Sequence, residues 1–102
     1  MPITKELIPR SKSAIVTFTV PIDISSSHTA CSIVGDFNNW NPTVHQLRRS
    51  NFYSPFSIKI ELPVNKTYEF KFLFEDSSWY VENEADGFIQ NVHGTQNSLL
   101  IL

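Results

Sequence analysis

Two tryptophans lie on turn-rich segments of this chain. Trp40 ends the run Gly-Asp-Phe-Asn-Asn-Trp at 35–40, whose polar residues favour turns and unusual backbone angles. Trp79 follows the turn Glu-Asp-Ser-Ser at 75–78. An exposed indole ring offers a flat apolar plate to the C–H face of a sugar ring, and nearby amides, hydroxyls or ammonium groups can bond its hydroxyl groups. These are the components of a site for a neutral polysaccharide.

Lys71 supplies an ammonium group in the segment 68–75, where aromatic residues alternate with Glu, Lys, Leu and Glu. Successive side chains of a strand point to opposite faces. The four aromatic residues are therefore expected to share a core face, and Lys71 to point away from the core. In the run 35–40, Phe37 has no polar group and is the better core candidate, which leaves Trp40 on the surface.

The sequence lacks the motifs of common catalytic and metal sites. It contains no Gly-x-Ser-x-Gly elbow, no Gly-rich phosphate loop and no His-Glu-x-x-His motif. The histidines are His28, His45 and His93, with no cysteine or carboxylate at metal-ligand spacing. The acidic pairs at 75–76 and at 82 and 84 would need a cleft holding them ~5–10 Å apart, which a thin sandwich rarely provides. We therefore expect no enzyme activity, no cofactor and no metal.

Composition also limits the partners. The chain has 102 residues, enough for one domain, and a net charge of −2 with no basic run beyond Arg48-Arg49, so nucleic acid is not an expected partner. No apolar stretch approaches the ~20 residues that span a bilayer, and residues 1–6 lack the apolar region of a secretion signal. Cys31 is the single cysteine. These features favour the cytoplasm and exclude the membrane.

Alternation and turn residues predict about seven short strands. The clear segments are 14–20, 29–34, 56–62, 67–75 and 98–102, and the weaker ones are 47–49 and 79–81. Residues 64–66 are interpreted as a hairpin loop and 25–27 as a loop tip. Residues 1–12 are expected to be a poorly ordered lead-in to one domain at 13–102. The pattern predicts an all-β fold of two packed antiparallel sheets.

Several of these segments together resemble carbohydrate-binding module family 48. The motifs are Gly-Asp-Phe-Asn-Asn-Trp at 35–40, Tyr-Glu-Phe-Lys-Phe at 68–72, Trp79, and Gly-Thr-Gln-Asn-Ser at 94–98, within a similarity that runs from about Ser13 to Leu102. The family includes the glycogen-binding domain of AMP-activated protein kinase β subunits and the N-terminal early-set domains of isoamylases and branching enzymes. The resemblance implies an immunoglobulin-like early-set β-sandwich.

The resemblance also implies non-catalytic binding of an α-1,4-linked glucan such as glycogen, starch or a maltooligosaccharide. In glycogen-binding members, two tryptophans cradle the glucan while a lysine, a threonine and an asparagine bond its hydroxyls. The matching positions are Trp40, Trp79, Lys71, Thr95 and Asn97. His93 stands where the family has an apolar residue that pierces the sugar ring. The turn 75–78 is one residue longer than the family's common form, and Asn83-Glu84 replaces its Asp-Pro.

The sequence leaves a second function open. The domain is also compatible with a scaffold that docks to a glycan-metabolising enzyme or a kinase through an edge strand. Taken singly, each candidate has a structural explanation: Trp40 anchors its loop, Lys71 pairs with a neighbouring glutamate, and Asn97 caps a turn. The occurrence of all of them in the family's order favours the sugar site.

Overall fold

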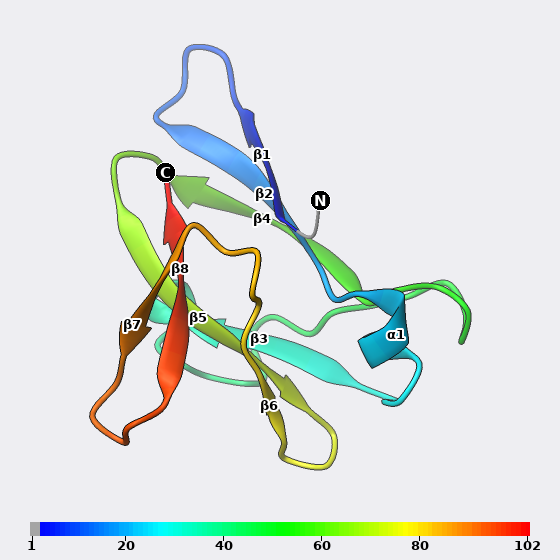
Figure 1. Cartoon of the computed structure of the whole chain (residues 1–102). Coiled ribbons are helices and arrows are strands. Elements are labelled where there is room, and N and C mark those ends of the chain that lie inside the picture. The colour runs from blue at the N-terminus through cyan, green and yellow to red at the C-terminus, as the bar shows by residue number, and fades with distance from the viewer. Residues whose placement is uncertain (1–2) are drawn as a thin grey trace.

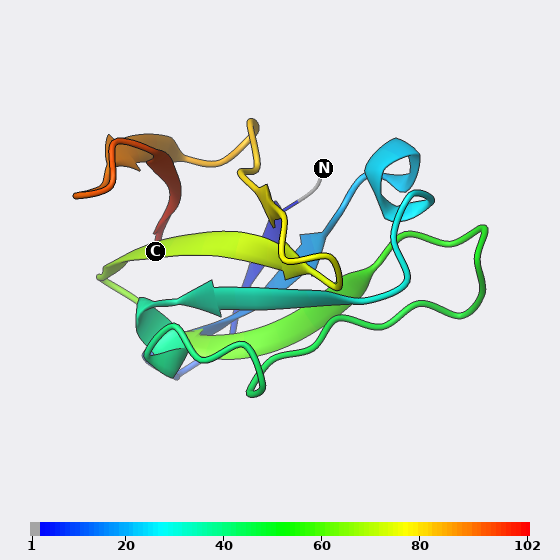
Figure 2. The same cartoon turned by 90° about the horizontal axis from the view of Figure 1, so that it is seen from below.

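Within residues 3–102, the part of the chain that the computed structural model describes, eight strands form two packed antiparallel sheets (Figure 1 and Figure 2). The strand order is β1-β2-β4 in the first sheet and β3-β5-β8-β7 in the second, with β6 added to β5. The strands are β1 (Ile3–Leu7), β2 (Ser13–Thr19), β3 (Cys31–Gly35), β4 (Ser57–Pro63), β5 (Thr67–Phe74), β6 (Trp79–Tyr80), β7 (Gly87–Gln90) and β8 (Gln96–Ile101). Two short helices, α1 (Ile22–Ser25) and the 3₁₀-helix η1 (Asp36–Asn38), lie before and after β3. The all-β sandwich expected from the sequence is confirmed.

The core lies between the sheets and is built by alternate residues of the central strands. All four aromatic residues of β5 at 68, 70, 72 and 74 are buried, as their spacing predicts. Phe18 of β2 joins the two sheets, because its ring centroid lies 5.2 Å from that of Phe70 and 6.5 Å from that of Phe72. Phe37 of η1 packs against the same cluster, with its centroid 6.2 Å from that of Phe18. This confirms Phe37 as the inward aromatic residue of its loop.

The expected hairpin at 64–66 is wrong. Strand β4 belongs to the first sheet and β5 to the second, so this segment carries the chain from one sheet to the other. Its backbone is fastened elsewhere: the Val64 N–H donates to the Lys12 carbonyl at 2.9 Å, and the Asn65 N–H donates to the Leu102 carbonyl at 3.2 Å. The alternation of apolar and polar residues does not distinguish a hairpin from a crossing between sheets, because each strand buries one face in either case.

The lead-in expected at residues 1–12 contains strand β1, which pairs with β2 along its whole length. Residues 1–2 of that lead-in lie outside the described residues. The sequence does not predict β1 or β7, because residues of these edge strands are almost all exposed and show no alternation in burial. The candidate strand at 47–49 contributes only an isolated bridge, from Arg48 to Ser57.

Ser25 is not at a loop tip. It ends α1 and is fully buried, where its Oγ donates to the Val20 carbonyl at 2.9 Å and accepts the Phe56 N–H at 3.2 Å. Its hydroxyl thus joins two chain segments that the sequence alone does not bring together. Neither helix found in residues 3–102 has the length and apolar composition to cross a membrane.

We predict that Phe18→Ala will lower the free energy of unfolding by about 3–5 kcal/mol, because the lost ring leaves a cavity between the sheets. Leu7→Ala is the control, since the Leu7 side chain is 73% exposed and its loss should cost less than about 0.5 kcal/mol. Urea unfolding followed by circular dichroism measures both. Equal costs for the two variants would contradict this packing.

Candidate functional site

A groove forms where two strands diverge along one side of β5. Strand β8 pairs with residues 67–70 of β5, and β6 pairs with residues 72–73. Lys71 lies between these two ladders. The side chain of Lys71 reaches Thr95, the residue before β8, and the ring of Trp79 at the start of β6.

The strand register turns the neighbouring side chains toward the same outer face. Trp79 of β6 pairs with residue 73 of β5, two positions after Lys71. Asn97 of β8 lies two positions before the partner of Glu69. Since side chains two apart in a strand share a face, Trp79, Asn97 and Lys71 all face away from the core.

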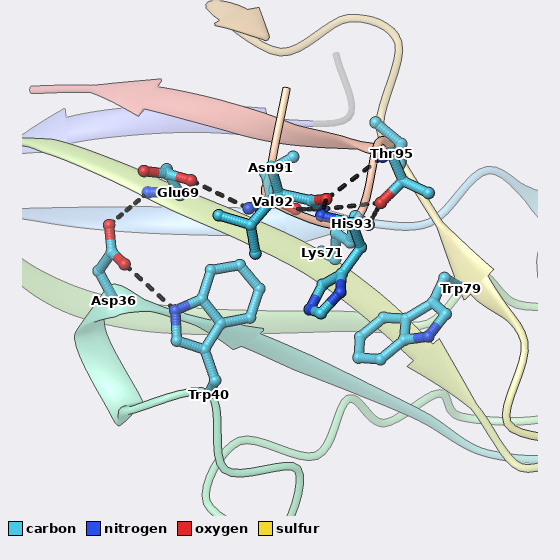
Figure 3. Close-up of a pocket in the computed structure, with 11 residues that line it drawn as sticks. Asp36, Trp40, Glu69, Lys71, Trp79, Asn91, Val92, His93 and Thr95 are labelled. Atoms are coloured by element: carbon cyan, nitrogen blue, oxygen red, sulfur yellow. Dashed lines mark hydrogen bonds between the residues drawn. The ribbon is translucent and has the colours of Figure 1, made fainter. Parts of the chain in front are cut away.

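All six residues singled out from the sequence line this groove, which has a volume of about 820 Å³ (Figure 3). They are Trp40, Lys71, Trp79, His93, Thr95 and Asn97. The volume lies within the range of about 300–1,000 Å³ that small-molecule sites occupy. The groove also has lining residues that the sequence did not single out: Asp36, Glu69, Val81, Asn91 and Val92.

The Trp40 indole is held by an unusual backbone. The φ angles of Asn39 and Trp40 are 55° and 57°, in the left-handed region that a bulky residue rarely adopts. The Trp40 N–H donates to the Gly35 carbonyl at 2.9 Å, and the indole Nε1 donates to Oδ1 of Asp36 at 3.2 Å. The side chain keeps 36% of its surface exposed. The ring is therefore anchored at its edge and open on a face.

Gly35 and Asp36 attach this loop to β5. A Cβ atom on Gly35 would collide with the carbonyl oxygen of Glu69, so this close approach requires glycine. Oδ2 of Asp36 accepts the Glu69 N–H at 2.8 Å, while its other oxygen holds the Trp40 indole. Asp36 thus fixes Trp40 relative to the strand that carries Lys71.

Lys71 faces away from the core but is only 7% exposed, which the sequence did not predict. Its Nζ donates to Oγ1 of Thr95 at 3.0 Å and lies 5.6 Å from the Trp79 ring centroid, within the range of a cation–π contact. Among the described residues, Thr95 is the one hydrogen-bond partner of this ammonium group. An ammonium group has three donors, so two of them remain for a ligand.

Asn91 organises the loop that carries His93 and Thr95. Its Oδ1 accepts the backbone N–H groups of His93 at 2.9 Å and Thr95 at 3.2 Å. Its Nδ2 donates to Oγ1 of Thr95 at 2.7 Å and to Oδ1 of Asn97 at 3.1 Å. Because Oγ1 of Thr95 accepts bonds from both Asn91 and Lys71, its own hydroxyl proton is left for a ligand.

The tip of the same loop projects over the groove. In the view of Figure 3 the imidazole of His93 projects between the two indole rings. Val92 is 95% exposed and, with Val81, adds apolar surface to the lining. The groove therefore combines aromatic and aliphatic surface with a small set of fixed polar groups.

Sequence reasoning missed Asp36, Glu69 and Asn91 as groove residues, although two of them carried a signal. Glu69 precedes Lys71 by two positions in a strand, so the alternation that places Lys71 on the outer face also places Glu69 there. Asn91 is a turn-forming residue that lies three positions before the Gly-Thr-Gln-Asn-Ser motif at 94–98. Nothing in the sequence indicates that Asp36 bonds the Trp40 indole.

The turn that carries Trp79 is tied to the segment before β3. Oε1 of Glu75 accepts the N–H groups of Thr29 at 3.0 Å and Ala30 at 3.3 Å, and Oε2 lies 3.1 Å from Nδ1 of His28. Partial removal from water raises the pKa of the Glu75 carboxyl, but hydrogen bonds from these three partners outweigh it and bring the pKa down to about 2. Glu75 is therefore an acceptor that fixes one end of the turn.

Ligand atoms of His28, Glu75 and Asp76 lie within 4.8 Å of one another, a grouping that their separation in the sequence does not reveal. Glu75 and Asp76 already accept backbone N–H bonds that shape the local turns. We therefore assign the group to the structure of these turns.

Comparison with known proteins does not extend the family resemblance described above. No protein-family model and no curated protein matches this chain. The argument for function therefore rests on the groove and on the residues that build it.

We predict that Glu75 stabilises the fold in a pH-dependent way. The folded-state pKa is lowered from 4.5 to about 2, so the stabilisation is complete above about pH 4.5 and is lost as pH falls through about 2. Urea unfolding of the wild type and of Glu75→Ala should therefore differ at pH 7 and converge between pH 4.5 and pH 2. A difference that stays constant over this window would contradict the assigned hydrogen bonds.

We also predict that Asn91→Ala will loosen the loop at 91–95. Amide hydrogen exchange of His93 and Thr95 should become about tenfold faster, because both N–H groups lose their acceptor. Asn51→Ala is a matched control, since Oδ1 of Asn51 accepts the Tyr53 N–H at 2.8 Å in a loop outside the groove. Similar exchange rates at His93 and Thr95 in the two variants would argue against the role of Asn91.

Proposed function

We propose that this groove binds an α-1,4-linked glucan, such as glycogen, starch or a maltooligosaccharide, without catalysis. The observation that carries the proposal is that both tryptophans of the chain line one groove together with Lys71, Thr95 and Asn97. The resemblance to carbohydrate-binding module family 48 supports the choice of an α-glucan. The early-set class of the domain belongs to the same proposal.

The two indole rings provide the apolar part of the interaction. The exposed fractions are 36% for Trp40 and 54% for Trp79, and the rings lie on separate elements, the loop after η1 and strand β6. Stacking a pyranose on each ring removes C–H surface from water at about 25 cal/mol for each Å². A helical α-glucan presents successive sugar faces, so two separated plates can contact neighbouring residues of one chain.

The polar groups between the rings select hydroxyls. Lys71 has two free N–H donors and Thr95 a free O–H donor, and both are already fixed by hydrogen bonds within the protein. Groups held in place before binding lose little conformational freedom when a ligand arrives. The open groove leaves part of the glucan in water, so we expect modest affinity.

A non-catalytic role is supported by the carboxylates of the groove. Asp36 accepts bonds from the Trp40 indole and the Glu69 backbone, and Glu69 accepts a bond from Nδ2 of Asn97 at 2.9 Å. Both oxygens of Asp36 are thus occupied by protein donors, so among the described residues the groove lacks the pair of free carboxyl groups that glycoside cleavage uses. A glucan-metabolising enzyme or a kinase remains the proposed class of protein partner, in line with the members of the resembled family.

Titration with maltoheptaose, followed by tryptophan fluorescence, tests the proposal. Because both tryptophans line the groove, the whole signal comes from the candidate site. We predict a saturable change that is weakened about tenfold or more by Trp40→Ala or by Trp79→Ala, each of which removes one stacking surface. Cellohexaose, a β-1,4-linked glucan, should bind more weakly.

Tyr53→Ala is the matched control, because this aromatic side chain is 90% exposed and lies outside the groove lining. It should leave the affinity for maltoheptaose unchanged. The absence of a fluorescence change at millimolar maltoheptaose would overturn the proposal and favour the protein-interaction role.

A further inference from the structure

Glu69 is the acidic residue beside Lys71 on the outer face of β5. The two residues are two positions apart, which corresponds to about 6.6 Å along a strand. Glu69 is half-buried and lines the groove, where Asn97 Nδ2 donates to its Oε1 at 2.9 Å. This bond orients the carboxylate and leaves its second oxygen available. The sequence suggests Glu69 only as a possible ion-pair partner of Lys71, and within residues 3–102 the Lys71 ammonium group bonds Thr95 and forms no ion pair with a glutamate.

The second oxygen of Glu69 differs from every other carboxylate oxygen of the groove. Both oxygens of Asp36 accept protein hydrogen bonds, one from the Trp40 indole and one from the Glu69 N–H. Oε1 of Glu69 accepts the Asn97 amide. Within residues 3–102, Oε2 of Glu69 is thus the one carboxylate oxygen of the lining without a hydrogen-bond partner. It is an acceptor prepared for an external donor.

The charges of the groove point to the kind of donor. Asp36 and Glu69 contribute two negative charges, and Lys71 contributes one positive charge. Apart from the histidine at its tip, the lining therefore carries an excess of one negative charge. A neutral sugar hydroxyl can donate to Glu69 without charge repulsion, whereas a phosphate or carboxylate on the sugar would be attracted by Lys71 but repelled by both Asp36 and Glu69.

We propose that Glu69 is a further sugar-binding residue that accepts a glucose hydroxyl and excludes anionic sugars from the groove. The inference rests on the proposed glucan binding and names the substrate class more narrowly, as uncharged glucan. Lys71 and Thr95 donate to the oxygens of the sugar, and Glu69 accepts one of its hydroxyl protons. The three side chains together recognise a hydroxylated ring as both donor and acceptor.

Two ligands that differ in charge provide the test. One is maltoheptaose, and the other is maltoheptaose whose primary alcohols have been oxidised to carboxylates. Binding of both is measured by tryptophan fluorescence at pH 8 and 10 mM salt. The wild type should prefer the neutral ligand by about tenfold or more.

Glu69→Gln removes the negative charge and replaces the free acceptor by an amide. We expect this variant to bind maltoheptaose about three- to tenfold more weakly and to lose most of the preference for the neutral ligand. Glu61→Gln is the control, because Glu61 is an exposed residue of β4 in the other sheet and its substitution changes the net charge by the same amount. It should keep the wild-type preference. The ratio of the affinities for the neutral and the oxidised ligand is compared among the variants. Any change that oxidation makes to the shape of the ligand affects all variants alike and cancels in this comparison.

A salt series on the wild type gives a second test that needs no variant. Raising the salt from 10 mM to 1 M shortens the screening length from about 30 Å to about 3 Å, so the preference for the neutral ligand should shrink several-fold. A Glu69→Gln variant that keeps the full preference, or a wild-type preference independent of salt, would overturn the inference while leaving glucan binding intact. A wild type that binds neither ligand would overturn the proposed function as well.

Discussion

Successive side chains of β5 point to opposite faces of the sheet, so one face of this strand packs in the core and the other lines the groove. One face places four aromatic rings in the core, where Phe18 of the opposite sheet packs against them. The other face presents Glu69 and Lys71 to the groove. A shift of one residue in the register of β5 would exchange these two sets. The packing of the core therefore also fixes the polar groups of the candidate site.

The remaining groove residues are held to this strand by hydrogen bonds. Asp36 links the Trp40 indole to the β5 backbone, and Asn91 links its own loop to Thr95 and Asn97. The left-handed backbone at Trp40 has a conformational cost that these contacts offset. A strained backbone of this kind persists only where the surrounding contacts hold it in place. The lining is thus organised before any ligand binds.

Much of this arrangement is predictable from local pattern, and the rest depends on long-range pairing. The alternation at 68–75 predicts both faces of β5, and Phe37 is the inward aromatic residue as its chemistry suggests. The segment 64–66 crosses between the sheets instead of forming the expected hairpin, because both connections share one local sequence pattern. The burial of Lys71 depends on where β6 and β8 diverge, and the role of Asp36 depends on the pairing of β3 with β5. No local sequence pattern encodes either of these long-range pairings. The family resemblance indicates which six residues to consider, and the paired strands and their loops bring these six residues to one groove.

Mapping the glucan onto the molecule tests the central claim most directly. In an amide and indole ¹H–¹⁵N NMR titration with maltoheptaose, we predict saturable shifts of both indole N–H signals and of backbone amides at 36–40, 69–71, 79–81 and 91–97. Signals of the exposed loop at 50–55 should stay in place. Shifts centred on that loop, or no saturable shifts at millimolar ligand, would contradict the account.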